Sequence, residues 1–325
     1  MTSLKCLTGI FTMAFAALLP LPSAMARDAA YPTRPVTIIV PFATGGGTDL
    51  LARFWGAILQ KELGQPFVAD VKPGASGSIG TRLAAKAEPD GYTLLIATPS
   101  IVMNPFIIDN VGYDPIKDFQ PIAVTGVSPL AFVVPLGSPI NSINDLIKQA
   151  RAEPGKLNVG TYGNGSVGQM ASLKFQALTG TKLTEIPYKG AAPALLDLVA
   201  GRTDLQIEAF PSVIGYIKNG KVKPLAIGSR KRSPLLPDMP TVLESGIDFE
   251  TFSWTAFLAP AKTPRPIIDK LHAAFRKALA DPETVAKLAD AFGSDPGDGT
   301  PEDARKFMIE RYQENAKLVK QFNLK

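Results

Sequence analysis

The strongest constraint on the fold is an alternation of short β-branched runs with helical patterns. The run Val36–Val40 lies between two prolines and predicts a strand, and residues 48–63 carry apolar side chains at helical spacing. Gly64 then suits the end of that helix. The pattern continues with a strand over 67–71, a helix over 78–87 and a strand over 92–97. Such a β-α-β-α-β order predicts an α/β fold with a mostly parallel sheet flanked by helices.

The same alternation resumes near Ala131 and predicts a second unit of the same kind. Its strands are expected at 131–134, 157–160, 205–207 and 225–227, and its helices at 143–152, 170–178 and 192–200. After a run at 252–258, the chain is predicted to be helical over 266–280, 282–292 and 301–323. The 325 residues fit two domains at about 100–200 residues each.

Two glycine-rich loops, residues 42–49 and 161–169, each follow a predicted parallel strand and open a helix. Ligands of open α/β sheets bind at this end of the strands. Helix N-termini offer unpaired N–H groups and a partial positive charge, and glycines let a ligand approach the backbone. One loop alone would be explained by tight turns and helix caps at Thr48 and Ser166. Two loops in the same context favour an anion site that needs no Lys or Arg.

Neither loop matches a nucleotide-binding motif, because there is no G-x-x-x-x-G-K-[ST] and no G-x-G-x-x-G at the first helix. We therefore expect no nucleotide and no other cofactor.

Composition excludes several classes of function. The chain has one Cys (Cys6) and one His (His272), so a His/Cys zinc site and an intrachain disulfide are excluded. A Ser–His or Cys–His catalytic pair would have to use His272, which has no evident partner. The formal net charge is +5, but the longest basic block is Arg230-Lys231-Arg232, which argues against nucleic-acid binding.

Residues 1–26 are predicted to be a signal peptide. Lys5 supplies the positive charge, an uncharged apolar run follows, and Ala24-Met25-Ala26 is a cleavage site, so that the mature chain begins at Arg27. No later run approaches the about 20 apolar residues of a membrane span. We expect an exported, periplasmic protein that does not insert into the membrane.

The ordered motifs of the mature chain resemble the Bug/TctC family, the extracytoplasmic solute receptors of tripartite tricarboxylate transporters. The resemblance extends from Tyr31 to the C-terminal helices. Its blocks are Val40-Pro41-Phe42 with Gly45, Gly46 and Asp49; Pro89-Asp90-Gly91-Tyr92; Tyr113-Asp114-Pro115; Gly163-Asn164-Gly165-Ser166; Pro187-Tyr188-Lys189-Gly190; and Ser253-Trp254.

The resemblance implies a two-lobe periplasmic binding protein of type II character, each lobe a mostly parallel sheet flanked by helices, with a ligand cleft between the lobes. Lobe 1 would comprise residues 27–126 and 253–325, and lobe 2 residues 127–252. The chain would be a monomer that binds a small carboxylate and delivers it to membrane transporter subunits. The chain departs from the family pattern in three places: Glu208-Ala209 replaces Asp-Asn, Gln169 replaces a common His, and Lys262 replaces a Gly.

The candidate ligand-binding residues come from both loops and from the strand and helix ends expected beside them. They are Phe42, Thr44, Gly45, Gly46, Thr48, Asp49, Ser100, Thr161, Gly163, Gly165, Ser166, Gln169, Gly190, Ala191, Glu208 and Phe210. We expect no catalytic residue and no metal ligand.

Four of these residues allow two interpretations each. Asp49 suits the first turn of a helix, which we favour, or a ligand contact. Glu208 is either a solvated edge residue or a cleft residue that disfavours a second ligand carboxylate and favours an amine or hydroxyl. Phe42 and Phe210 could line the cleft or belong to the core.

Three functions compete at this point. The first is a non-enzymatic receptor, the second a sensor subunit that binds the same ligand for signalling, and the third a periplasmic hydrolase or isomerase that uses carboxylates. An enzyme of the third kind needs two carboxyl groups with opposed pKa shifts in one pocket, and the sequence shows no such pair at motif spacing.

Overall fold

The computed structural model describes residues 31–322 of the chain, and all elements below lie in the compact unit that begins at Pro32. The signal peptide predicted for residues 1–26 lies outside the described residues, so cleavage after Ala26 stays a prediction. Within residues 31–322, no helix is both long and apolar enough to cross a membrane.

The first part of the chain forms parallel strands joined by helices. β1 (Val36–Val40) pairs in parallel with β2 (Phe67–Val71) and β3 (Thr93–Ala97). Between them lie α1 (Gly47–Leu63), the short helix η3 (Ala75–Gly77) and α2 (Ser78–Ala85), and α3 (Ser100–Ile107) follows β3. Gly64 ends α1 in the left-handed region at φ 76°, where a residue with a Cβ would be strained.

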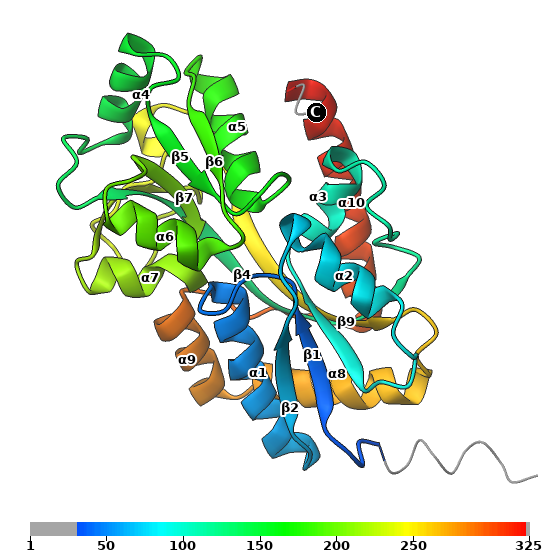
Figure 1. The fold of residues 1–325 in the computed structure, drawn as a ribbon. Helices are drawn as coiled ribbons and strands as arrows, with labels where there is room; N and C mark the ends of the chain where they lie inside the picture. The colour runs from blue at the N-terminus through cyan, green and yellow to red at the C-terminus, as the bar shows by residue number, and fades with distance from the viewer. Residues whose placement is uncertain (1–30, 323–325) are drawn as a thin grey trace, which may run out of the picture. The chain divides into compact units, whose positions relative to one another are not determined.

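Two long antiparallel strands connect the halves of the sheet. β4 (Phe119–Pro135) pairs with β9 (Phe252–Pro260) through Pro129, and from Leu130 onward it pairs with β7 (Leu205–Ala209) and β8 (Val222–Ile227). The strand order is β2-β1-β3-β9-β4-β7-β5-β6, with β8 added to β4. We call the half that contains β1–β3 lobe 1 and the half that contains β5–β7 lobe 2. Figure 1 shows β4 and β9 between the two groups of helices.

Lobe 2 repeats the parallel pattern. β5 (Asn158–Thr161) pairs in parallel with β6 (Thr184–Pro187) and β7. Its helices are α4 (Ile143–Ala152), α5 (Val167–Thr179), α6 (Ala191–Val199) and α7 (Phe210–Lys218), and the short helix η4 (Leu243–Ser245) precedes β9. The sheet as a whole is therefore mixed: β1 pairs in parallel with β2 and β3, and β5 with β6 and β7, whereas β4, β8 and β9 pair antiparallel.

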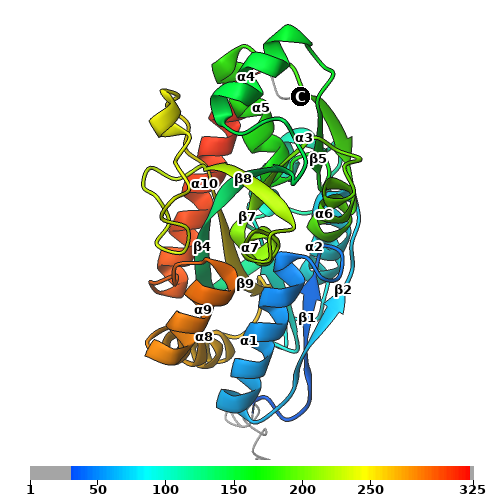
Figure 2. The same cartoon turned by 90° about the vertical axis from the view of Figure 1, so that its left-hand side faces the viewer.

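The C-terminal helices return to lobe 1. α8 (Arg265–Leu279) packs against α1 and β4, and α10 (Pro301–Phe322) packs along β4 and α3. α9 (Pro282–Phe292) reaches α7 of lobe 2 (Figure 2). The expected boundaries between the lobes lie close to where β4 changes partners and where β9 begins. The lobe boundaries at 126/127 and 252/253 stay a prediction.

Aromatic side chains fill the core of each lobe. In lobe 2, the rings of Phe132 and Phe175 lie 5.1 Å apart between centroids. Near the connecting strands, Trp254 is 2% exposed and contacts Phe307 edge to face at 5.4 Å. Burying each such side chain stabilises the fold by about 1.5–3 kcal/mol. The strands that connect the lobes therefore rest on a packed core.

Candidate functional site

A small cavity of about 40 Å³ lies where lobe 1 meets lobe 2. Its lining is rich in Ser and Thr and contains one ionisable carboxyl, that of Glu208. None of its lining residues is Lys, Arg or His. The lining residues are Phe42, Gly46, Gly47, Thr48, Leu51, Thr98, Gly126, Ser128, Tyr162, Ala191, Glu208, Ala209, Pro211, Ser212, Ser253, Thr255 and Ser294.

Three helices begin at this cavity. Gly46 and Gly47 lie at the start of α1, Ala191 is the first residue of α6, and Ala209 immediately precedes α7. Helix N-termini carry partial positive charge and unpaired N–H groups. Their convergence creates an environment for an anion that depends on backbone rather than on cationic side chains.

The first loop, residues 42–49, is held by Asp49. This side chain is 1% exposed; its Oδ2 accepts a hydrogen bond from the Gly45 N–H at 3.0 Å, and its Oδ1 accepts one from Arg53 Nε at 3.0 Å. Both carboxylate oxygens therefore already have donors. Asp49 is absent from the cavity lining, in keeping with the favoured interpretation of a first-turn carboxylate.

The loop also makes a close contact between the lobes. The Gly47 N–H donates to Ser212 Oγ at 3.2 Å, and a Cβ at Gly47 would lie 2.8 Å from the carbonyl carbon of Pro211. A Cβ at Gly190 would lie 2.8 Å from the Cβ of Ala43. Residues 43–47 of lobe 1 thus contact the beginnings of α6 and α7 in lobe 2, which only glycine permits at these two positions.

The second loop, residues 161–169, is organised by its own side chains. Ser166 Oγ caps α5 by accepting from the Gln169 N–H at 3.3 Å. Gln169 Oε1 accepts from the Gly165 N–H at 2.7 Å, and its Nε2 donates to Asn164 Oδ1 at 3.2 Å. Gln169 therefore shapes the loop.

The second loop belongs to lobe 2 and faces η3 and α3 of lobe 1, whereas the first loop precedes α1 of lobe 1. Cβ atoms at Gly163 and Gly165 would lie 2.4 Å from Ser76 Oγ and 2.6 Å from Asn104 Oδ1, in η3 and α3. The two loops meet through the rings of Phe42 and Tyr162, whose centroids are 5.6 Å apart. They lie on the same interface between the lobes, and only Tyr162 of the second loop lines the cavity.

Five of the sixteen candidates from the sequence line the cavity: Phe42, Gly46, Thr48, Ala191 and Glu208. Ser100 Oγ and Thr161 Oγ1 are buried without a hydrogen-bond partner among the described residues. Phe210 belongs to the core of lobe 2. The other eight lie outside the lining: Thr44, Gly45, Asp49, Gly163, Gly165, Ser166, Gln169 and Gly190.

The sequence alone did not identify most of the Ser and Thr side chains that line the cavity. Thr98 follows β3 and Ser212 lies in the first turn of α7, so both stand at strand or helix ends where a ligand is expected. Ser253 and Thr255 face the cavity from β9, whereas Phe252 and Trp254 line a larger groove of about 530 Å³ between α5 and α10. Alternation along β9 therefore directs hydroxyls to one cavity and aromatic rings to the other.

Glu208 lies in the interior. It belongs to β7, pairs with Ala131 and is 1% exposed, so the interpretation as a solvated edge residue is wrong. Gln206 Nε2 donates to Oε2 at 2.8 Å, and the Ala209 N–H donates to Oε1 at 3.0 Å. Burial raises the pKa of Glu208 from 4.5 to about 7, although these donors favour its charged form.

Tyr162 is the other titratable residue that lines the cavity. Burial, and next the charge of Glu208, hold its pKa well above the ordinary value of 10. The phenol is therefore neutral and can donate or accept a hydrogen bond. Among the described residues, no group of three or more His, Cys, Asp or Glu side chains could hold a metal ion.

The fold and this interlobe cavity define the chain as a two-lobe solute-binding protein. The family model of the tripartite tricarboxylate transporter family receptor matches residues 51–324, and the chain belongs to this family, known as TctC. The predicted membership in the Bug/TctC receptors is confirmed. The chain is accordingly a receptor and not an enzyme.

Individual relatives agree over nearly the whole chain. BugT of Bordetella pertussis is 35% identical over 328 residues, which cover 100% of this chain and 99% of BugT. Rpa4515 of R. palustris, solved with adipate, is 37% identical, with a TM-score of 0.87 over 90% of this chain and 98% of that one. The periplasmic binding protein BugD is 34% identical, with a TM-score of 0.87 over 91% and 99%. The predicted fold class of a two-lobe periplasmic binding protein is confirmed.

Proposed function

We propose that this chain captures a small carboxylate between its lobes in the periplasm and delivers it to the membrane subunits of a tripartite tricarboxylate-type transporter. The observation that carries the proposal is the convergence of three helix N-termini and seven Ser or Thr side chains on one interlobe cavity. Rpa4515, which has the same fold, was solved with adipate, and this supports an organic acid as the ligand.

The energetics of such a site suit a receptor. Hydrogen bonds to a charged group contribute about 1.5–3 kcal/mol each. Four or five of them, less the cost of closing the lobes, leave a binding free energy near −8 kcal/mol, or about micromolar affinity. Because the cavity is small and the lobes touch at Gly47, the ligand must enter a more open arrangement. The closed arrangement is then favoured by contacts from both lobes.

The position of Glu208 bears on which acids bind. Its carboxyl group shares the cavity with the ligand, so a second ligand carboxylate beside it is disfavoured and an amine or hydroxyl is favoured. While Glu208 is ionised, we infer that the ligand half next to it carries a hydrogen-bond donor. Comparing mono- and dicarboxylates with the E208Q variant tests this, because an unchanged order of preference would count against a contact.

Calorimetric titration of the mature protein with a panel of carboxylates tests the receptor function. We expect binding without turnover, and loss of binding in A191D, which places a negative charge at the start of α6 inside the cavity. L196D is the matched control, because Leu196 lies on the same helix and is 62% exposed. Equal binding by both variants would overturn the proposed site.

Export and delivery need their own tests. The first residue of the periplasmic protein should be Arg27, as N-terminal sequencing can establish. Deleting the gene should abolish uptake of the labelled acid by cells. Unchanged uptake with an altered transcriptional response to the acid would instead indicate a sensor.

A further inference from the structure

Glu208 presents an electrostatic problem to the proposed function, on which this inference rests. The carboxyl group lines the same cavity as the N-termini of α1, α6 and α7. Its side chain is 1% exposed, so water screens it little. A bound carboxylate would therefore add a second negative charge to an enclosure of about 40 Å³.

Among the described residues that line the cavity, no charged group offsets that second charge. Of the lining residues contributed by β4, β9, α6 and α7, none is titratable. Tyr162, which follows β5, stays neutral because burial holds its pKa above 10. On α1, Arg53 is already paired with Asp49 at 3.0 Å, and neither residue lines the cavity.

Keeping two like charges in one poorly screened site costs free energy, so one of the two acids takes up a proton. The ligand carboxylate is stabilised by helix N-termini, whereas Glu208 has lost its hydration. We propose that capture of a carboxylate is coupled to uptake of one proton by Glu208, whose O–H then donates a hydrogen bond within the closed cavity.

The hydrogen bonds of Glu208 leave room for this role. Each carboxyl oxygen accepts one donor, from Gln206 and from the Ala209 N–H, and retains a second lone-pair direction. Burial already raises the pKa of Glu208 to about 7, so the free protein binds this proton more readily than an exposed carboxyl group would. A neighbouring negative charge raises that pKa further.

The coupling fixes the direction of the pH dependence. If one proton binds with each anion, affinity falls about tenfold for each pH unit above the pKa of the free protein. A ligand that places an ammonium group beside Glu208 behaves differently, because the cation pairs with the ionised carboxylate and no proton is taken up.

Calorimetric titrations with caproate, adipate and ε-aminocaproate from about pH 5.5 to about pH 8.5 separate these cases. Buffers of different ionisation enthalpy give the number of protons exchanged. We expect uptake approaching one proton for caproate and adipate at the upper end of this range, and none for ε-aminocaproate. Caproate or adipate binding without proton uptake would overturn the inference, as would equal uptake with ε-aminocaproate.

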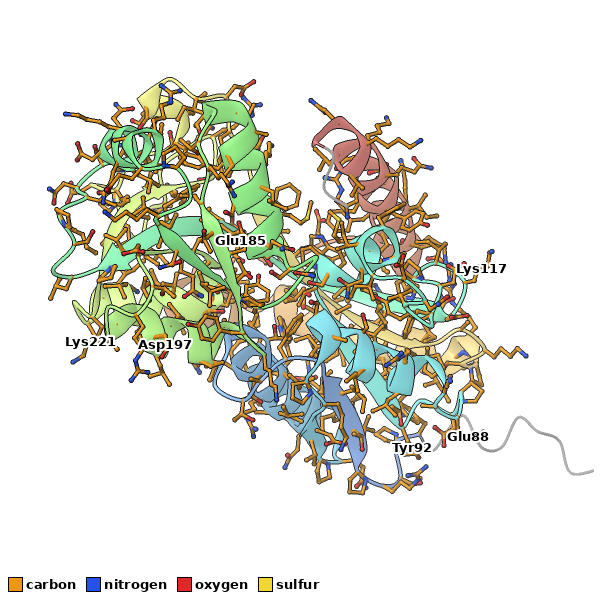
Figure 3. The ribbon with its side chains drawn as sticks, turned by 45° about the horizontal axis from the view of Figure 1, so that its top comes forward. Glu88, Tyr92, Lys117, Glu185, Asp197 and Lys221 are labelled. Atoms are coloured by element: carbon orange, nitrogen blue, oxygen red, sulfur yellow. The ribbon has the colours of Figure 1, made fainter. Side chains whose placement is uncertain are left out.

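Two variants assign the proton to its residue. E208Q should lose both the proton uptake and the pH dependence of caproate binding. E185Q should keep both. Burial raises the pKa of Glu185 to about 7 as well, and this residue lies on β6 of lobe 2 (Figure 3), but it is absent from the residues that line the cavity. Proton uptake that persists in E208Q, or that disappears in E185Q, would overturn the assignment.

Infrared difference spectroscopy of the unmodified protein gives a reading that does not depend on the folding of a variant. Binding of caproate at about pH 8 should produce the C=O band of a protonated carboxylic acid. Binding without this band would contradict the inference while leaving the receptor function intact. Failure of all three acids to bind at any pH would instead overturn the receptor function, and this inference with it.

Discussion

The backbone N–H of Gly47 donates a hydrogen bond to Ser212 Oγ at 3.2 Å, and this bond joins the first helix of lobe 1 to α7 of lobe 2. The two backbones lie so close that a Cβ on Gly47 would stand 2.8 Å from the Ser212 nitrogen. Ser212 also lines the cavity with Glu208, and its hydroxyl favours the ionised form of that carboxyl. One hydroxyl therefore takes part in the contact between the lobes and also influences the charge of the cavity carboxyl.

Replacing Gly47 with Ala should hold the lobes apart. The added methyl group meets backbone atoms of Pro211 and Ser212, which cannot move without displacing α7. We expect carboxylate affinity to fall at least tenfold, or about 1.4 kcal/mol, with a larger radius of gyration in X-ray scattering with ligand. The control is Gly215→Ala on α7, where no atom lies within 4 Å of the added Cβ. Equal affinities of the two variants would show that the contact does not limit closure.

Elements set by local patterns were predicted well from sequence, whereas elements set by distant partners were not. The strand Val36–Val40 and the helix that ends before Gly64 carry their signals within a few residues. The first half of β4 was missed because Pro121, Gly126 and Pro129 interrupt it, and its pairing with β9 compensates for them. α7 was missed because Pro211 resembles a helix breaker, although proline is favoured in the first turn.

The residues of the candidate site divide in the same way: local patterns predict some of them, and the packing of distant segments determines the others. The first loop and the start of α6 could be identified because glycines and helix starts are visible in sequence. Glu208 was assigned to a strand end, but β7 extends to Ala209 and buries it. Ser253 and Ser294 could not be found, because their approach to the cavity depends on how β9 and the segment after α9 pack.

Removing the carboxylate of Asp49 should weaken ligand binding indirectly, because Asp49 holds the first loop but does not line the cavity. The Gly45 N–H and Arg53 would lose their buried acceptor, and the loop at the start of α1 would loosen. We expect Asp49→Ala to cost about 1–3 kcal/mol in unfolding free energy, measured by urea titration, and to lower affinity. Arg53→Ala should have a smaller effect, because that side chain is 55% exposed. Unaltered stability in Asp49→Ala would contradict this role.

Gln169 should act on the shape of the second loop. Its amide holds the Gly165 N–H and Asn164, so Gln169→Ala leaves the loop with fewer constraints. We expect a loss of about 1 kcal/mol in unfolding free energy and faster amide hydrogen exchange at Gly165. Gln321→Ala is a control on an exposed glutamine in α10. Unchanged exchange at Gly165 would show that the glutamine contacts do not order the loop.

Glu185 should make the stability of lobe 2 depend on pH. It accepts hydrogen bonds from Ser172 Oγ at 2.7 Å and Gln176 Nε2 at 3.1 Å, but burial dominates and raises its pKa from 4.5 to about 7. The folded state therefore holds this proton more tightly than the unfolded chain does. The resulting stabilisation is complete below about pH 4.5, is lost as pH rises to about 7, and amounts to at most about 3 kcal/mol. Thermal unfolding across this range should show a decline that E185Q makes shallower; Glu208, whose pKa burial also raises to about 7, accounts for part of the remaining slope. Glu88→Gln, on an exposed carboxyl group, should retain the full decline. Parallel curves for E185Q and the unmodified protein would mean that Glu185 is ionised in the folded state throughout.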